Sequence, residues 1–435
     1  MRARSELPLA LFCAAACAAS AAHAPRRGSK VIEIRQQTNL QEPVPIQVPA
    51  VPILDVDLRV PLPVALVSPG ASCGRLYCNT SMNSRLPGAA PAKALKVRWQ
   101  APFTPAFQPS TVLQEGNRVL AYGGGVYRLY DLDGKLIAEG RTGSSGMVLD
   151  SENGLFYFLS SYGYITARRL ADDGEEFNLN PAPGSAWPFL ARRGNLIFNL
   201  AVELPQPWKN EPPNQAIFQH LDLPEALERD DTKIVMNLTG AGALYLRTAT
   251  VKVAISGERV VLGLPGRLLL SPIDLHPTAA LDGDFMPQAL SLDELGRIHV
   301  VVSSGDQTAL WVLTPSGQRS AKVTFKPEYG APFGQPIIGY DHRIFLIHSG
   351  LTAYDAYGDL LWERWPKGRV AGAGITTDGQ LIVSGGDLAA YDAKGERRLL
   401  FMLPGVSLQT PPAMSTSGEI FVASKDTVYC LTSGR

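Results

Sequence analysis

Five histidines downstream of the amino-terminal segment could act as bases or metal ligands: His220, His276, His299, His342 and His348. His342 occupies a turn, and His299 and His348 lie in strand-like segments with alternating apolar neighbours, a setting typical of structural or exposed histidines. The sequence contains no G-x-S-x-G, H-E-x-x-H, P-loop or dinucleotide-binding motif. Nucleophilic, zinc-peptidase and nucleotide chemistry therefore lack a starting motif, and no catalytic residue is assigned.

Two aspartate-rich segments resemble the start of calcium-binding loops, namely residues 131–134 (DLDG) and 282–284 (DGD). Neither continues with the later oxygen ligands and the glutamate that such a loop requires. Aspartate followed by glycine is also the usual composition of a tight turn. We therefore expect turns at both places, and we assign neither a metal site nor a bound cofactor.

The cysteines suggest a disulfide rather than a metal centre. Four residues separate Cys73 from Cys78 in a stretch rich in Gly, Ser and Asn, and in an oxidising compartment this spacing favours a local disulfide. Zinc would need two further ligands nearby, and the closest downstream histidine is His220. Cys430 is then expected to be free.

Residues 1–24 have the three parts of a secretory signal peptide. Arg2 and Arg4 precede an apolar stretch, and Ala22-His23-Ala24 matches an A-x-A cleavage site. An alternative cleavage before Cys17, which follows three alanines, would make Cys17 the site of lipidation. The protein is thus expected in the periplasm or outside the cell, associated with the outer membrane if Cys17 carries lipid.

The charge balance excludes two classes of partner. Among 435 residues, 40 are Lys or Arg and 40 are Asp or Glu, and charged residues make up 18% of the chain. This composition has no basic footprint for nucleic acid or for an anionic membrane surface. No apolar run after the signal peptide approaches the length of a transmembrane span.

Residues 25–94 differ in composition from the rest of the chain. Within them, residues 42–66 alternate Pro with Val, Ile and Leu, which excludes a helix and favours an extended segment. We interpret residues 25–94 as an extended arm or linker. Because a solvated stalk would be more polar, the arm could adhere to a partner or to the side of the main domain.

From residue 96 onward the chain repeats a short unit, in which a turn pair containing Gly or Asp precedes a β-branched or aromatic strand. Eight copies are found, at residues 116, 154, 194, 257, 296, 342, 379 and 418. The spacing is close to forty residues, apart from one long step that contains a polar insertion at residues 203–216. Several short strands in about forty residues are typical of one blade of a β-propeller.

These repeats predict an all-β fold, an eight-bladed β-propeller over residues 95–435. The last repeat ends without a fourth strand, whereas residues 96–99 form a strand with no repeat before it. We therefore expect the amino-terminal strand to complete the last blade and close the ring, which would leave no open sheet edge there.

The segment Tyr354-Asp355-Ala356-Tyr357-Gly358, with Trp362 four residues after its glycine, resembles the PQQ-like β-propeller repeat. Trp99 supplies the equivalent tryptophan through the expected closure, whereas other repeats have Ala138, Ala321 and Leu399 at this position. The superfamily includes quinoprotein dehydrogenases and non-catalytic scaffolds, such as the propeller lipoprotein of the outer-membrane β-barrel assembly machinery. The resemblance therefore implies a fold and leaves the activity open.

The leading functional hypothesis is an exported, non-enzymatic scaffold that binds an envelope or secreted protein or a surface polymer. The alternative is an oxidoreductase that depends on a quinone cofactor, although the adjacent cysteine pair typical of those enzymes is missing. Of three tryptophans that could line a binding surface, Trp187, Trp208 and Trp311, we expect Trp311 to be in the core. Trp208 lies in the insertion and is the candidate contact residue.

Overall fold

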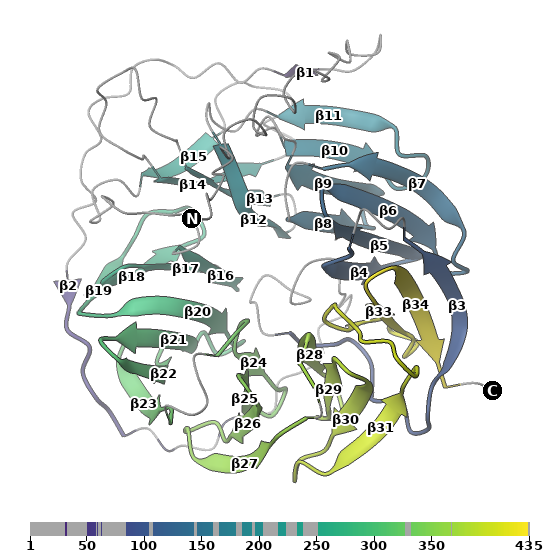
Figure 1. Ribbon diagram of the computed structural model, residues 1–435. Coiled ribbons are helices and arrows are strands. Elements are labelled where there is room, and N and C mark those ends of the chain that lie inside the picture. The colour runs from purple at the N-terminus through teal and green to yellow at the C-terminus, as the bar shows by residue number, and fades with distance from the viewer. Residues whose placement is uncertain are drawn as a thin grey trace, which may run out of the picture.

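The computed structural model is an all-β ring of short antiparallel sheets that follow one another along the chain (Figure 1). It describes residues 31–32, 50–57, 59, 62, 84–103, 108–142, 146–159, 165–179, 185–193, 196–202, 216–222, 233–237, 251–326, 332–366 and 368–433, with only the backbone of the strands within 185–237. These described residues contain no helix, and therefore none that could span a membrane.

The described strands form eight sheets, which we number as blades 1 to 8. Blade 1 consists of β4 (Thr111–Glu115), β5 (Arg118–Gly123), β6 (Val126–Asp131) and β7 (Leu136–Arg141). Blade 2 consists of β8 (Met147–Asp150), β9 (Leu155–Leu159), β10 (Ile165–Arg169) and β11 (Glu175–Leu179). Blade 3 consists of β12 (Ser185–Arg193), β13 (Leu196–Val202), β14 (Ala216–Asp222) and β15 (Lys233–Asn237). Blade 4 consists of β16 (Lys252–Ser256), β17 (Arg259–Leu264), β18 (Arg267–Pro272) and β19 (Ala279–Asp282).

The second half of the ring has the same organisation. Blade 5 consists of β20 (Met286–Leu292), β21 (Ile298–Ser304), β22 (Gln307–Leu313) and β23 (Arg319–Thr324). Blade 6 consists of β24 (Ile337–Ile338), β25 (Ile344–Ile347), β26 (Leu351–Tyr354) and β27 (Leu360–Arg364). Blade 7 consists of β28 (Gly372–Ile375), β29 (Leu381–Ser384), β30 (Leu388–Tyr391) and β31 (Arg397–Phe401). Blade 8 consists of β32 (Ala413–Met414), β33 (Ile420–Ala423), β34 (Thr427–Thr432) and β3 (Lys96–Pro102).

Burial follows the position of a strand within its blade. The second strands β21, β25 and β33 are almost continuously apolar and buried, because neighbouring blades cover both of their faces. The fourth strands β7 and β23 alternate between exposed and half-buried residues, because they face solvent at the rim. The core therefore lies between blades, and each blade depends on its neighbours.

The order of the strands defines two ends of the ring. Within a blade, the first strand pairs with the second, the second with the third and the third with the fourth, all antiparallel. The turns between strands one and two and between strands three and four therefore lie at one end, which we call the arm end. The turns between strands two and three, and the connections to the next blade, lie at the other, which we call the insertion end.

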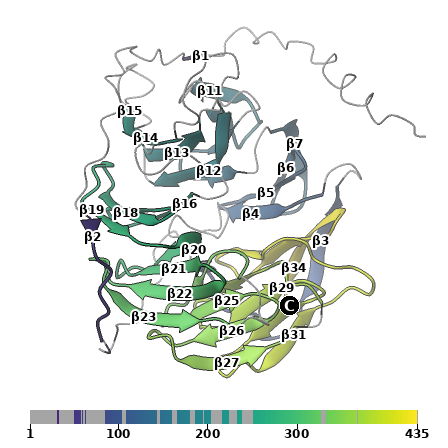
Figure 2. The same ribbon diagram turned by 60° about the vertical axis from the view of Figure 1, so that its left-hand side comes forward.

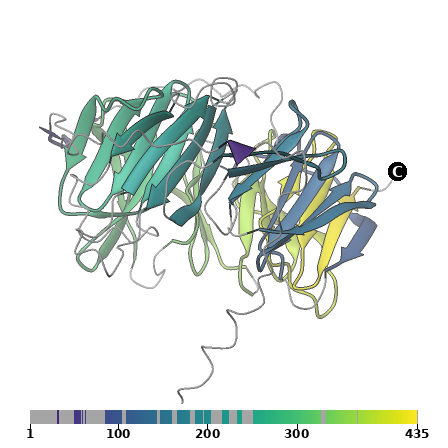
Figure 3. The same cartoon turned by 90° about the horizontal axis from the view of Figure 1, so that it is seen from above.

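The ring closes as the sequence predicts. β3 pairs with β34 from Lys96 opposite Thr432 to Pro102 opposite Thr427, so the fourth strand of blade 8 comes from the amino-terminal side of the chain. Blue β3 and yellow β34 accordingly lie side by side in Figures 1 and 3. The expected fold class, a propeller closed by an amino-terminal strand, is confirmed.

The two expected tryptophans pack against the glycine turn of the following blade. The indole of Trp99 donates a 2.7 Å hydrogen bond to the carbonyl oxygen of Leu132 and lies against Gly134. Trp362 lies against Gly395 in the same way. Both glycines have positive φ, and a β-carbon at either would collide with the indole. Backbone conformation and lack of space therefore each require glycine at these positions.

The arm follows the outside of the ring before it enters the core. β1 (Val31–Ile32) pairs in parallel with β11, and β2 (Ala50–Val51) pairs in parallel with β19, beside which it lies in Figures 1 and 2. Asp55 then bridges to Arg319 on β23, and Arg59 pairs with Asp359 at 2.8 Å. These segments cover outer strands that would otherwise present open edges.

Candidate functional site

Two regions of the described structure combine polar or aromatic groups in an unusual way, and they lie at opposite ends of the ring. The first is at the arm end, where residues 84–90 of the arm cross its middle. Leu86 is fully buried among core residues of blades 7 and 8, and Arg85 forms a parallel bridge with Ile375 of β28. The last part of the predicted linker is therefore built into the propeller.

Arg85 joins the arm to two blades. Its guanidinium donates hydrogen bonds to the carbonyl oxygens of Ile338 and Gly339 at 2.9 and 2.7 Å, and it pairs with Glu294 at 2.7 Å. It also lies over the ring of Tyr340, 4.6 Å from the centroid, an attractive arrangement for a cation. Every strong interaction that this arginine can make is thus used within the protein.

Next to Arg85 lies an ionic cluster made of the buried Asp293, Arg297, His299 and His342 together with the partly exposed Glu294. One carboxylate oxygen of Asp293, Oδ2, lies 2.7 Å from Arg297 Nε, 3.3 Å from His299 Nε2 and 3.7 Å from His342 Nδ1. The other, Oδ1, accepts the backbone N–H groups of Leu295 and Arg297. Asp293 is therefore surrounded by donors although it is completely buried.

The electrostatics of the cluster follow from this geometry. Burial alone would raise the pKa of Asp293, but the neighbouring imidazoles of His299 and His342 and the charge of Arg297 lower it well below its usual range. Burial lowers the pKa of His299, which favours its neutral form despite the nearby carboxylate. The carboxylate is held ionised and the imidazole neutral, so the cluster is a structural network centred on Asp293, in which Arg297 Nη2, His299 Nδ1 and His342 Nδ1 make no hydrogen bond.

His342 is held in a strained backbone conformation. Its φ is +63°, whereas the equivalent turn position is Gly296, Gly379 or Gly418 in other blades. Its side chain is 1% exposed and lies 3.4 Å from Glu294 Oε1, on the neighbouring blade. The contact with the carboxylates offsets a backbone conformation that costs about 1 kcal/mol or more in a residue other than glycine.

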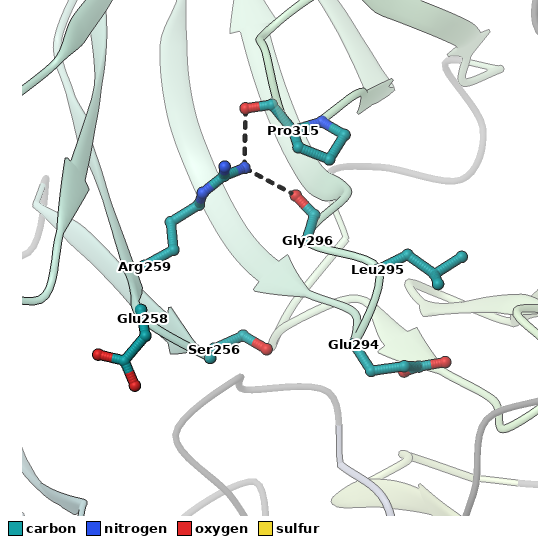
Figure 4. A pocket seen from close by; sticks show the side chains of 8 residues that line it. Ser256, Glu258, Arg259, Glu294, Leu295, Gly296 and Pro315 are labelled. Atoms are coloured by element: carbon teal, nitrogen blue, oxygen red, sulfur yellow. Dashed lines mark hydrogen bonds between the residues drawn. The ribbon is translucent and has the colours of Figure 1, made fainter.

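An open hollow of about 260 Å³ lies beside this cluster, at the seam between blades 4 and 5 (Figure 4). Arg259 crosses it and donates hydrogen bonds to the carbonyl oxygens of Gly296 and Pro315 at 3.5 and 2.8 Å. Arginines of three other first turns bond carbonyl groups of the next blade in a similar way, namely Arg118, Arg297 and Arg343. The hollow therefore lies at a junction where arginine hydrogen bonds join two neighbouring blades.

The second region is at the insertion end and consists of two exposed aromatic residues, Phe333 and Trp365, which we call the aromatic surface. They are 43% and 55% exposed. Both adjoin the turn between β25 and β26, because the Phe333 N–H donates to the carbonyl oxygen of Ile347 and the indole of Trp365 lies edge-on to His348 with ring centroids 6.1 Å apart. The backbone of Phe333 and the indole of Trp365 therefore adjoin the same turn.

That turn is rigid. His348 is 2% exposed, its Nδ1 accepts the N–H of Gly350 at 3.0 Å, and its Nε2 lies 3.2 Å from Thr352 Oγ1. Burial lowers the pKa of His348, so the ring is neutral and donates through Nε2. A β-carbon at Gly350 would stand 3.1 Å from the indole of Trp365, so the indole rests directly on the turn. The turn beneath Trp365 is thus held by hydrogen bonds of its own.

The structure places the residues singled out in the sequence as follows. Trp311 is 8% exposed and packs edge-on against Phe285 in the core, as predicted. The carboxylate of Asp131 accepts backbone N–H groups of its own turn, and Asp282 pairs with Arg267. Within the described part of the chain, no three His, Cys, Asp or Glu side chains converge closely enough to ligate a metal ion.

The structure describes only some of the residues on which the cysteine and insertion predictions depend. Cys430 is a free, buried thiol whose pKa is raised by burial to about 12. Cys17, Cys73, Cys78 and Trp208 lie outside the described residues, as do most of residues 203–216. The insertion joins β13 to β14, the second and third strands of blade 3, so it begins and ends at the insertion end.

Comparison with known proteins identifies the architecture. No protein-family model and no curated protein matches the sequence. Among solved structures, BamB from Moraxella catarrhalis is similar with a TM-score of 0.51 and 11% identity, over 78% of this chain and 99% of that one. A europium-containing methanol dehydrogenase is similar with a TM-score of 0.55 and 10% identity, over 84% and 98% of the two chains.

The computationally designed protein Ika8 is similar as well, with a TM-score of 0.50 and 10% identity, over 75% of this chain and 96% of that one. At these identities the likeness concerns the fold alone. The neighbours agree with the β-propeller fold expected from the repeat, and they include proteins with different roles. The role of this chain must therefore be argued from its own surface.

Proposed function

We propose that the protein is an exported, non-enzymatic β-propeller scaffold that binds an envelope or secreted protein, or a surface polymer, through its insertion end. Export rests on the signal peptide at residues 1–24, with Cys17 as the alternative lipid anchor and a disulfide between Cys73 and Cys78. BamB, a structural neighbour, agrees with a location in the cell envelope.

The observation that carries the proposal is the aromatic surface. Phe333 and Trp365 are large and exposed and adjoin one turn, and exposed aromatic residues are common anchors of protein interfaces. The insertion that contains Trp208 is attached at the same end. At the arm end, by contrast, residues 84–90 of the arm pack against the ring, and charged groups there bond to one another.

A pull-down from envelope extracts of the source cell tests this proposal. We expect Trp365→Ala and Phe333→Ala to reduce capture of the partner, and Trp208→Ala to reduce it as well if the insertion shares the interface. Leu360→Ala is the matched control, because Leu360 is 54% exposed but lies at the rim. Unchanged capture by all three aromatic variants would contradict the proposal.

The alternative, a quinone-dependent oxidoreductase, is favoured by one observation, the shared fold of the europium-containing methanol dehydrogenase. Absorbance and metal analysis of the purified protein, together with a dye-linked assay with alcohols and sugars, test it directly. Stoichiometric quinone with substrate-dependent dye reduction would establish the oxidoreductase in place of the scaffold.

A further inference from the structure

Residues 84–88 of the arm lie against blade 7 as an added strand. One edge of β28 pairs with β29, and the other edge pairs with the arm. There the Leu86 N–H donates to the carbonyl oxygen of Ile375 at 2.7 Å, and the Ile375 N–H donates to the carbonyl oxygen of Ser84 at 3.0 Å. Proteins commonly bind extended peptides at a sheet edge in this way, because main-chain hydrogen bonds give affinity and side-chain pockets give selectivity. We call the surface beneath these residues the arm groove, and it is lined by Glu294, Gly339, Tyr340, Gly374, Ile375 and Met414.

The arm groove contains a pocket for an arginine. The Arg85 guanidinium bonds the carbonyl oxygens of Ile338 and Gly339. The Glu294 carboxylate and the face of Tyr340 complete the pocket, in which the arginine side chain is 10% exposed. A flat guanidinium with five N–H groups can make all of these contacts at once, whereas the ammonium group of lysine cannot. The pocket therefore selects arginine.

A second pocket holds Leu86, which is completely buried among residues of blades 7 and 8. A β-carbon at Gly374 would stand 2.8 Å from Leu86 Cγ, so the lack of a side chain at Gly374 makes room for the leucine. The Tyr340 hydroxyl donates to the carbonyl oxygen of Leu86 at 3.2 Å. The groove thus accepts a branched apolar residue directly after the arginine.

The backbone approaches blade 8 closely at Gly88. A β-carbon there would stand 2.9 Å from Met414 Sδ and 3.2 Å from the carbonyl oxygen of Ser415, so this position requires glycine. The carbonyl oxygen of Gly88 accepts the N–H of Thr377 at 3.0 Å. All of these contacts come from residues 84–88, and the side-chain requirements reduce to the pattern Arg-Leu-x-Gly.

We propose that the arm groove is a binding site for an extended segment of a partner protein with the pattern Arg-Leu-x-Gly, and that residues 85–88 occupy it as an autoinhibitory contact. The partner segment displaces the arm and pairs with β28 in the same register. Because the arm is tethered, it competes at an effective concentration on the order of millimolar. The arm groove lies at the arm end, so this inference does not depend on the aromatic surface.

Peptide binding to the full-length Arg85→Ala variant tests the inference, because its arm lacks the arginine whereas its groove is intact. The probe is a fluorescent peptide with the sequence of residues 84–90, and its anisotropy measures binding. We expect the variant to bind the peptide at least about tenfold more tightly than the parent, whose own arm competes. Peptides that contain Arg85→Lys, Leu86→Ala or Gly88→Ala should each bind about tenfold or more weakly than the unchanged peptide. Arg59→Ala is the matched control, since Arg59 belongs to the arm but pairs with Asp359 outside the groove.

Amide hydrogen exchange reports the occupancy of the groove directly. The N–H groups of Ile375 and Thr377 donate to carbonyl oxygens of the arm, so they should exchange faster in Arg85→Ala than in the parent. Added peptide should restore their protection, and the amides of β29 are the internal control. Circular dichroism and a melting curve show that each variant is folded. If Arg85→Ala failed to fold, Arg85→Lys would take its place.

Three outcomes would overturn the inference: no binding of the peptide to Arg85→Ala, equal binding of the peptide that contains Arg85→Lys, or unchanged exchange at Ile375 and Thr377 in Arg85→Ala. A parent dimer that the peptide dissociates would overturn it as well, because the arm of a second copy would then fill the groove. If Trp365→Ala abolished partner capture while the peptide failed to bind, the proposed function would stand and the arm groove would be purely structural.

Discussion

The arm end and the insertion end of this ring use their polar and aromatic residues in opposite ways. At the arm end, Arg85 pairs with Glu294, Arg297 pairs with Asp293, and His342 lies close to both carboxylates. At the insertion end, Trp365 and Phe333 remain exposed on a turn that needs no partner to hold its shape. The difference teaches that charges paired with one another within the fold indicate structure, whereas exposed aromatic residues indicate binding.

Removal of the closing strand should cause the largest loss of stability, because the structure of both ends depends on a closed ring. A chain that begins at Gln100 lacks most of β3, and it leaves β34 with an open edge. Since each unpaired buried backbone group costs about 1 to 3 kcal/mol, we expect a loss of several kcal/mol and a tendency to aggregate. Urea denaturation and light scattering measure both, and a melting curve equal to that of the parent would contradict the closure.

Asp293→Asn should be the most damaging single substitution at the arm end. It leaves the buried Arg297 without its carboxylate, which typically costs about 3 to 5 kcal/mol. The pKa of Asp293 is lowered in the folded protein, so its ionised form stabilises the fold above its ordinary value of 3.8, and this contribution is lost as the pH falls below that value. Urea denaturation at pH 7 and at pH 3 should therefore show a large difference between variant and parent that shrinks in acid. A difference that is the same at both pH values would contradict the assignment.

Arg85→Ala tests how strongly the arm holds its end closed. The substitution removes the ion pair with Glu294 and leaves two carbonyl oxygens without their donor, so we expect a loss of about 1 to 3 kcal/mol. Limited proteolysis should cut the arm of the variant faster than that of the parent. Arg85→Lys keeps the charge but cannot bond both carbonyl oxygens in the same geometry. Its rate of cleavage should lie between those of Arg85→Ala and the parent. Equal cleavage rates in all three proteins would mean that Arg85 does not fasten the arm.

His342→Gly should change stability less, because two effects oppose each other. Glycine adopts positive φ without strain, which favours the variant, but the buried imidazole and its contacts with Asp293 and Glu294 are lost. We expect a net loss of about 1 kcal/mol, and a smaller loss for His342→Asn, since asparagine tolerates this conformation and can still donate a hydrogen bond. A higher melting temperature for His342→Gly than for the parent would show that the imidazole does not stabilise the fold.

Trp365→Ala should have the smallest effect on stability, within about 0.5 kcal/mol of the parent, because the side chain is 55% exposed. The same substitution should have the largest effect on partner capture. Thermal melting and pull-down on one protein sample measure the two quantities together. A large fall in melting temperature would indicate that Trp365 belongs to the core, and the contrast between the two ends would disappear.

Much of the fold could be predicted from the sequence, because a propeller repeats a local pattern. The turn before each second strand and the turn after each third strand have recognisable residues, and Trp362 and Trp99 mark the fourth strands. The ring closure followed from an incomplete last repeat and an extra first strand. Each of these features depends on residues close together in the chain, so a single sequence contains them.

The arm-end cluster could not be predicted in the same way. His299 and His342 are 43 residues apart and belong to different blades, and Arg85 belongs to the arm. A weak signal was present, since His342 takes a turn position that is glycine in several other repeats and Asp293 opens its turn where Thr376 and Ser415 open others. Trp365 gave a similar signal, as a tryptophan just beyond the fourth strand.

The sequence alone therefore determined the repeat, the class of fold and the strand that closes the ring, because hydrophobic alternation and turn chemistry act over a few residues. Only the tertiary structure decided that the arm packs against one end, that an arginine and two histidines from two blades surround one buried aspartate, and that Trp365 and Phe333 are exposed at the other end. These features depend on how neighbouring blades pack side by side. The physical reason is that burial and ion pairing depend on distances between side chains in space. The repeat pattern predicts the course of the backbone, but it does not predict the contacts of side chains that differ from the repeat.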